Sequence, residues 1–292
     1  MANTIALKRR IGSVKNTKQI TKAMELVAAS KMRKAQEHAQ ASRAYRESAY
    51  HLLARLSSVT ELADHPLFAA RPIKTRLHIV ITSNRGLAGA YNSNVLRLLA
   101  KEITKDRSSG IESQIIAVGQ KGTNFVNRLE GVQLVAVFND FSDHPTANEV
   151  RPLLTTVTDL YQRQEVDAVN VVYTDFISNI NQQAKQLALL PAKFTDEDST
   201  QEETPELGDM TFEPSAAEVL DNVAMRLVEV QIWQAMLESL ASEQSMRMMA
   251  MKSATDNATD LIDDLTLAFN TARQAAITQE LAEITGGAEA IK

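Results

Sequence analysis

A single apolar stripe runs through the last third of the chain without losing phase. It steps alternately by four and three residues, and thirteen of its sixteen positions are apolar, against 44% for the whole chain. A straight α-helix drifts by about 20° per heptad against such a repeat, so a stripe that stays in register predicts a left-handed supercoil with another helix. The positions are Val223, Leu227, Val230, Gln234, Leu237, Ala241, Gln244, Met248, Met251, Thr255, Ala258, Ile262, Leu265, Phe269, Ala272 and Ala276.

The first part of the chain carries a second, poorer helical pattern. No Gly or Pro interrupts it between Gly12 and Pro66, and the C-terminal stretch from Ser215 to Thr285 is equally free of both. Each stretch can therefore form one long helix, of about 80 Å and 106 Å respectively. The apolar or small residues of the first pattern are Ile20, Met24, Val27, Ala35, Ser42, Tyr45, Ala49, Leu52 and Leu56. This face needs a partner, and we expect the two helices to pair antiparallel because a whole domain separates them.

The middle of the chain has a different period. Short apolar runs at 77–82, 114–118, 132–138 and 168–173 alternate with helical patterns around 95–103, 125–129 and 148–163. Such alternation predicts a mostly parallel, Rossmann-like α/β sheet. A turn near Asn179 and a return strand at 186–190 predict an antiparallel hairpin at one edge. The expected fold class is α/β plus a long antiparallel coiled coil.

These patterns define four segments. We expect an N-terminal coiled-coil helix at residues 1–60, a central α/β domain at 70–194, an acidic loop at 195–214 and a C-terminal coiled-coil helix at 215–286. Pro205, Gly208 and Pro214 favour the loop. The sequence Ser215-Ala216-Ala217-Glu218 is typical of a capping box that opens the last helix, and Gly286-Gly287 is suited to end it.

The charge of the chain is divided between its ends. Residues 1–60 carry a net charge of +9 and residues 206–292 a net charge of −10, which favours pairing of the two ends over binding of nucleic acid by the first. The chain has no cysteine, so disulfides, thiol catalysis and cysteine-bound metals are excluded. Its five histidines lack metal-ligand spacing, and no apolar run is long enough to span a bilayer. We expect neither a metal nor a cofactor.

Three motifs invite a chemical interpretation. Gly86-Leu87-Ala88-Gly89 lies between a strand and a helix, where α/β domains bind phosphate, but the spacings of dinucleotide and P-loop motifs are absent, which favours a structural turn. Gly119-Gln120-Lys121-Gly122 is likewise interpreted as a turn. Among the clustered methionines, Met248 and Met251 fit the coiled-coil core, whereas Met246 and Met249 fall outside it and are expected to face another partner.

Two terminal motifs resemble those of a known family. The sequence ITKAMELVAASKMRK at 20–34 is similar to the N-terminal signature of the γ subunit of F-type ATP synthases, and ARQAAITQEL at 272–281 is similar to the C-terminal signature. The sequence SNRGLAG at 83–89 resembles the family's SDRGLCG turn, with Asn84 and Ala88 in place of Asp and Cys. The matches SEQ, RM and AMKSATDN at 242–257 extend the resemblance. No long regulatory cysteine insertion of the chloroplast type is present, which suggests a bacterial-type subunit.

The resemblance implies a function. The chain would be the central-stalk rotor shaft, turned by the proton-driven c-ring within the hexameric ring of α and β subunits, with the ε subunit beside it. It would have no catalytic site of its own and would lie on the cytoplasmic face of the bacterial inner membrane, held there only through the complex. The residues expected to contact the β subunits or the rotor are Met24, Lys31, Arg33, Arg273, Gln274 and Thr278. The loop Thr195–Met210 is a candidate for the foot near the c-ring.

Two other classes of protein remain as alternatives. A nucleotide-binding α/β enzyme with a coiled-coil arm would require the isolated chain to bind ATP or NAD. A coiled-coil tether for DNA or membranes would use the basic residues Lys31, Arg33 and Lys34, and would show salt-dependent binding of nucleic acid. No aromatic residues are interleaved with these cations, which favours a partner-facing or solvated side of a helix.

Overall fold

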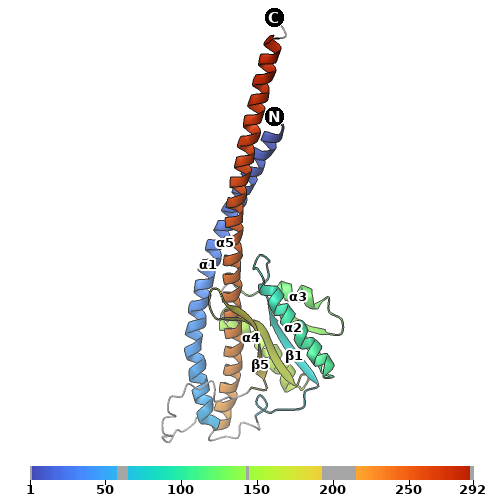
Figure 1. Ribbon diagram of the computed structural model, residues 1–292. Helices are drawn as coiled ribbons and strands as arrows, with labels where there is room; N and C mark the ends of the chain where they lie inside the picture. The colour runs from blue at the N-terminus through green and yellow to red at the C-terminus, as the bar shows by residue number, and fades with distance from the viewer. Residues whose placement is uncertain (1, 58–64, 143–144, 193–214, 290–292) are drawn as a thin grey trace. The chain divides into compact units, whose positions relative to one another are not determined.

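The computed structural model describes the backbone of residues 2–57, 65–142, 145–192 and 215–289, and the side chains of 4–41, 65–142, 145–192, 215 and 218–286 (Figure 1). The chain divides into two compact units. The coiled-coil unit comprises Met1–Ala29 and Arg247–Lys292, and the head unit comprises Ser30–Met246. The helices α1 (Ala2–Ser57) and α5 (Ala216–Glu289) each contribute to both units. The expected acidic loop at 195–214 lies outside the described residues.

The head unit contains one five-stranded sheet in the order β3-β2-β1-β4-β5. The strands are β1 (Thr75–Ile81), β2 (Glu112–Val118), β3 (Gln133–Phe138), β4 (Ala168–Phe176) and β5 (Gln182–Leu190). The first four are parallel, and β5 pairs antiparallel with β4. The predicted mostly parallel sheet with an edge hairpin is therefore confirmed. Strands β1 and β4 are buried on both faces, which explains why their sequences are continuous apolar runs.

The helices cover the two faces of the sheet. They are α2 (Tyr91–Ser108), α3 (Gln120–Val126) and α4 (Ala147–Gln162), and α3 begins five residues before the expected helix near Phe125. The chain moves outward from β1 through α2 to β2, and later crosses back through α4 to β4. Right-handed crossovers in opposite directions place α2 and α4 on opposite faces. Accordingly, Val95 and Leu99 of α2 pack in one buried cluster, and Leu153 and Tyr161 of α4 pack in the other.

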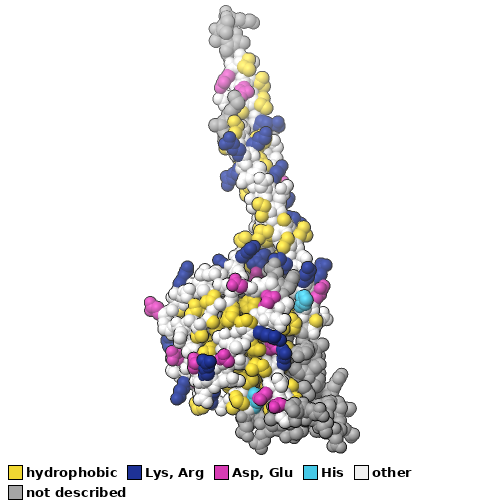
Figure 2. Space-filling model, turned by 180° about the vertical axis from the view of Figure 1, so that it is seen from behind, with side chains coloured by type: hydrophobic (Ala, Val, Ile, Leu, Met, Phe, Trp, Pro, Cys, Tyr) yellow, Lys and Arg dark blue, Asp and Glu magenta, His cyan; other side chains and the backbone are white. Residues whose placement is uncertain are grey.

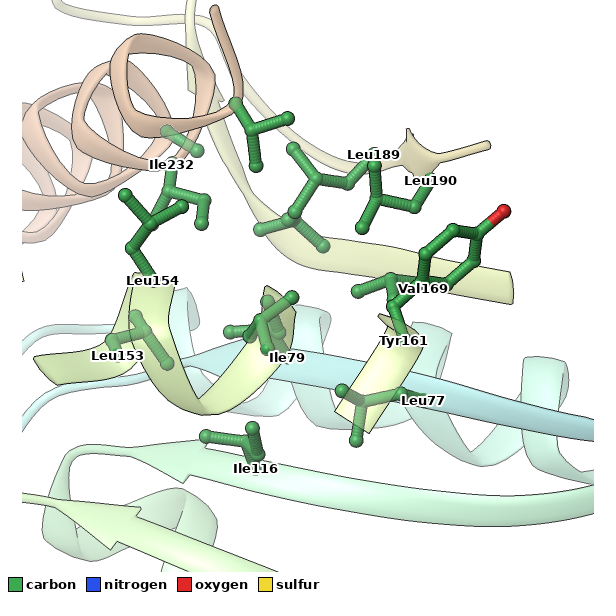
Figure 3. Close-up of a cluster of buried hydrophobic side chains, with 14 of the residues drawn as sticks. Leu77, Ile79, Ile116, Leu153, Leu154, Tyr161, Val169, Leu189, Leu190 and Ile232 are labelled. Carbon is green, nitrogen blue, oxygen red and sulfur yellow. The ribbon is translucent and has the colours of Figure 1, made fainter. Parts of the chain in front are cut away.

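Helix α5 is part of the core of the head unit. Ala224, Val228, Ile232, Ala235 and Met236 belong to the same buried cluster as α4 and the sheet. Figure 3 shows Ile232 facing this cluster, together with Leu153 and Leu154 of α4 and residues of β1, β2, β4 and β5. The long helix is thus built into the fold of the head, so the two cannot separate without exposing this core.

The predicted α5 stripe is buried or half-buried at all sixteen positions, seven of them in the head unit and nine, from Met248 to Ala276, in the coiled-coil unit. From Lys252 onward most residues between these positions are exposed. The two helical segments of the unit run in opposite directions (Figure 1), and Thr21 Oγ1 of α1 lies 2.8 Å from Thr255 Oγ1 of α5. Helix α5 continues through Gly286 and Gly287 to Glu289, so these glycines do not end it as expected.

The phase predicted for α1 is wrong in this unit. Ile20 and Val27 are 60% and 55% exposed, whereas Thr21 and Ala28, one position further on, are buried. From residue 18 to residue 28 the seam positions hold small or polar residues, whereas the larger apolar residues Ile20, Leu26 and Val27 are exposed. The seam of α1 steps by three and four residues, and its buried or half-buried positions are Thr4, Leu7, Ile11, Val14, Lys18, Thr21, Glu25 and Ala28.

A buried polar cluster in the head gives a prediction about pH. His78 of β1 is fully buried, and its Nε2 lies 2.8 Å from Oδ2 of Asp106, which also pairs with Arg76. Burial lowers the pKa of His78 below 6.5, and the hydrogen bond to Asp106 only partly offsets this effect. The charge of Arg76 lowers the pKa as well, and the charge of Glu102 raises it. Neutral His78 thus donates to Asp106.

We expect the head to lose stability as the pH falls below about 6.5. The unfolded histidine takes up a proton in that range while the folded one does not, so up to about 1.4 kcal/mol per pH unit is lost. Thermal unfolding between pH 7.5 and 5.5 can be followed through Trp233, the only tryptophan of the chain. The His78→Gln variant keeps a donor to Asp106 without titrating, so its midpoint should fall less. Equal losses in both proteins would contradict this role of His78.

Candidate partner interface

The coiled-coil unit exposes an unusual number of large apolar side chains. It holds about a quarter of the chain but ten of the fifteen exposed large apolar side chains in the described residues. They are Ile5, Ile20, Leu26, Val27, Met249, Leu261, Leu267, Ile277, Leu281 and Ile284. Figure 2 shows apolar side chains on the outer surface of this unit, interspersed with charged ones. Exposed apolar surface of this extent is typical of a protein interface.

On α1, the outward side chains form one stripe. Ile20, Met24 and Val27 are spaced by four and three residues and therefore share one face of the helix. Met24 is half-buried between its two exposed neighbours. The face that the sequence assigned to the coiled-coil seam is thus the outer face. The predicted contact residue Met24 belongs to that outer stripe.

A similar stripe lies near the end of α5. Ile277, Leu281 and Ile284 repeat the same spacing and are about half or more exposed. Arg273, Gln274 and Thr278 are beside them, and all three are exposed. The Thr278 hydroxyl donates to the carbonyl oxygen of Gln274 at 3.0 Å. Three predicted contact residues therefore lie on an accessible, partly apolar helix end.

The structure does not bring all of the predicted residues together. Arg273 lies 18 residues beyond Thr255 on α5, whereas Met24 is one turn from Thr21 on the antiparallel α1. Met24 and the Arg273–Thr278 group are consequently about 30 Å apart along the coiled coil. Lys31, half-buried, and Arg33, exposed, belong to the head unit. The predicted contact residues of the coiled-coil unit therefore lie at two separate places along its length.

The charges of the two helices do not pair across the seam as expected. The cations Lys8, Arg9, Arg10 and Lys15 of α1 are exposed, and so are the four aspartates Asp256, Asp260, Asp263 and Asp264 of α5. Within the described part of the chain, no ion pair joins these two sets. Lys22 pairs locally with Glu25 at 3.0 Å. The charges point outward and give α1 a basic surface and α5 an acidic one.

The turn after β1 lies where an α/β sheet binds phosphate, and α5 packs against the end of this turn, which is otherwise largely exposed. Gly89, at a positive φ of 54°, faces the backbone of Met246, and the Tyr91 hydroxyl at the start of α2 donates to Ser239 Oγ at 3.1 Å. Ser83 Oγ is hydrogen-bonded to the carbonyl oxygen of Arg85 at 2.6 Å. Met246 therefore contacts the chain's own head and not another partner, contrary to the expectation from the sequence.

Two further predictions concern single residues near these turns. The turn expected at 119–122 is confined to Gly119, which has a positive φ of 91°, because Gln120, Lys121 and Gly122 form the start of α3. Met249 is 41% exposed, as expected for a residue outside the seam.

Sequence analysis missed Ser239, Ser242 and Ser245, which form hydrogen bonds between α5 and the rest of the head. Their regular three-residue spacing beside the apolar stripe was the signal that could have revealed them.

No helix in the described residues combines the length and apolar character needed to cross a bilayer.

Comparisons with known proteins agree along the whole chain. The family model described as ATP synthase matches residues 3–291. The ATP synthase gamma chain of Acidithiobacillus ferrooxidans is 44% identical over 291 residues, and that of Polaromonas naphthalenivorans is 41% identical over 291 residues; each match covers 100% of both chains.

Solved structures are similar in fold. A chain from the central stalk and c-ring of the Tetrahymena thermophila mitochondrial ATP synthase has a TM-score of 0.62 and 25% identity, over 80% of this chain and 99% of that one. A chain from the Euglena gracilis mitochondrial OSCP/F1/c-ring assembly has a TM-score of 0.67 and 19% identity, over 99% of this chain and 95% of that one.

Proposed function

The chain belongs to the ATP synthase γ-chain family, and we propose that its coiled coil is the rotating shaft that couples a proton-driven ring in the membrane to the catalytic sites of the enzyme. One observation carries the proposal from geometry alone. The coiled-coil unit buries only a narrow seam and leaves two apolar stripes and most of its charges on the outside. Such a rod needs other subunits around it that cover these apolar stripes.

We propose that the hexameric ring of α and β subunits surrounds the coiled coil in this way. A rod with a basic α1 surface and an acidic α5 surface cannot contact three equivalent sites alike. Each orientation of the rod therefore stabilises a different conformation at each site, and rotation moves these preferences around the ring. This is a shift of populations by differential contact, in which each site's nucleotide affinity follows the surface that it faces.

Further partners follow from the same proposal. The head would lie with the ε subunit and the c-ring, and the segment 195–210 would face the ring, although it lies outside the described residues. The coiled-coil segments would be residues 1–60 and 215–286, and the α/β domain residues 70–194. The complex would hold the chain at the cytoplasmic face of the bacterial inner membrane.

We propose that the chain has no catalytic site of its own. Helix α5 packs beside the position where a related α/β sheet would bind a nucleotide, with Met246 next to Gly89 and Ser239 hydrogen-bonded to Tyr91. A Rossmann-like enzyme would need that crevice open at the carboxyl ends of the strands. The observation supports a head that transmits force rather than performs chemistry.

The predicted contact residues on α5 give the test. Replacing Arg273 and Gln274 with alanine should lower ATP synthesis by membrane vesicles about threefold or more, because both side chains are exposed and are proposed to face the β subunits. The helicity of the isolated chain should not change, since alanine is a strong helix former.

Two controls make the result specific. The Arg273→Lys variant keeps the positive charge and should retain more synthesis than Arg273→Ala. The Thr271→Ala variant removes an exposed side chain close by and measures the effect of any change on this helix. Unchanged synthesis in the double variant, with normal assembly, would remove these residues from the proposed interface.

A further inference from the structure

Three buried serines lie in a row on α5 within the head unit. Ser239, Ser242 and Ser245 are at most 1% exposed, and their spacing of three residues places them along one side of the helix. They follow directly after the apolar residues that α5 contributes to the core, which end at Met236. The contact of α5 with the head thus has an apolar part and then a polar part.

Each serine is hydrogen-bonded to the β4–β5 hairpin. Ser239 Oγ accepts a hydrogen bond from the backbone N–H of Thr174 at 3.1 Å, and Ser242 Oγ donates to the carbonyl oxygen of Thr174 at 3.3 Å. Ser245 Oγ donates to the carbonyl oxygen of Asn179 at 2.9 Å and accepts from Gln182 Nε2 at 3.1 Å. These bonds run along the hairpin from β4 to its turn and into β5.

The turn of the hairpin is itself held firmly. The backbone N–H of Ser178 donates to the carbonyl oxygen of Asn181 at 2.9 Å, and Ser178 Oγ accepts from the N–H of Asn181 at 3.0 Å. Gln36 Nε2 of α1 donates to Asn179 Oδ1 at 3.2 Å. The hairpin turn therefore contacts both long helices within the head unit.

The two parts of this contact resist different movements. Apolar packing resists separation, but the hydrophobic effect is non-directional and sets the angle of a helix less sharply than hydrogen bonds do. Hydrogen bonds weaken steeply when their angles change. A row of them on one side of α5 therefore adds a directional restraint on the rotation and register of the helix against the hairpin.

We propose that Ser239, Ser242 and Ser245 form a torque lock, which makes α5 turn with the head when the head is driven. This inference rests on the proposed function as a rotor shaft. The serines are positioning residues, because they touch no nucleotide and act only through the orientation of α5. The apolar core holds the head together, and the serine row keeps α5 from slipping within it.

The test uses the complete enzyme in membrane vesicles. The Ser239→Ala/Ser242→Ala/Ser245→Ala variant removes three hydroxyls without adding volume. We expect ATP hydrolysis within a factor of two of the unmodified enzyme, and a fall of about threefold or more in protons pumped per ATP hydrolysed. The Ser253→Ala variant alters an exposed serine of the same helix and should leave this ratio unchanged.

The outcomes separate the two proposals. If the enzyme with the unmodified chain does not couple hydrolysis to pumping, the rotor function itself fails. If it does, an unchanged ratio in the triple variant overturns the torque lock alone. A proportional loss of hydrolysis and pumping also overturns it, because this is the result of a merely structural role. Should the triple variant not assemble, the three single variants are measured by the same ratio, where a fall supports the torque lock and an unchanged ratio overturns it.

Discussion

Replacing Leu265 with aspartate is expected to unfold the coiled-coil unit of the isolated chain, whereas the same change at Leu267 is expected to leave it folded. Both residues lie on α5 two positions apart, so the change in helix propensity is the same. Leu265 is 8% exposed in the seam, and Leu267 is 69% exposed on the outer surface. A carboxylate in the seam loses the apolar burial of the leucine and is partly removed from water, which costs about 3 kcal/mol or more.

Two measurements on the full chain read out this difference. Circular dichroism at 222 nm reports the loss of helix, and hydrogen exchange of residues 247–289 places that loss within α5. Trp233 fluorescence serves as an internal control, because it reports the head unit, which should stay folded in both variants. Equal destabilisation by the two substitutions would show that the α5 stripe does not form the seam.

The second large effect concerns the apolar end of α5. Changing Ile277, Leu281 and Ile284 to serine should lower ATP synthesis by the assembled enzyme about tenfold and leave the isolated chain with the same melting curve. These side chains are exposed in the chain alone, so removing them costs it little. Within the ring of α and β subunits these side chains would be covered. Each serine substitution would then lose burial worth about 25 cal/mol per Å² of apolar surface.

A matched control is available on the same turns of the helix. Gln279→Ser and Glu283→Ser change two exposed polar residues, which hydrogen-bond only to each other at 2.9 Å among the described contacts. They should have a small effect on synthesis. A triple variant that synthesises ATP at the normal rate would show that no apolar surface of the surrounding subunits covers this end of α5.

The long repeat of α5 could be predicted because it is sustained over many heptads and no other structure keeps such a pattern in phase. The sheet could also be predicted, since strands buried on both faces read as continuous apolar runs. In both cases the burial of large side chains dominates the sequence pattern. The local pattern and the tertiary structure then agree.

The seam of α1 could not be predicted in the same way. Ile20, Met24 and Val27 are more apolar than Thr21 and Ala28, so they dominate any judgement of the buried face. We propose that they lie outside in order to contact other subunits, whereas single-chain reasoning assumes that the most apolar face packs within the chain. The outward charges of both helices show the same limit. Interfaces with absent subunits mislead such predictions.

The partners of the serines that bond α5 to the head could not be predicted, for a different reason. Ser239, Ser242 and Ser245 show a regular spacing, but nothing in the sequence says that the β4–β5 hairpin lies against them. Their partners, Thr174 and Asn179, are more than sixty residues away. Long-range hydrogen bonds to backbone groups leave no pattern in the side chains of the partner strand.

Rotation of this chain within a ring of α and β subunits is the property on which both proposals depend. The chain has no cysteine, so Lys101→Cys, at an exposed position on α2, provides a unique site for a fluorescent or bead label. The labelled chain is assembled with bacterial α and β subunits, and the ring is fixed to a surface. With ATP, we expect the label to turn in one direction and to pause at positions that repeat with the threefold symmetry of the ring. A label that stays still while the assembled complex hydrolyses ATP would contradict the proposed rotation.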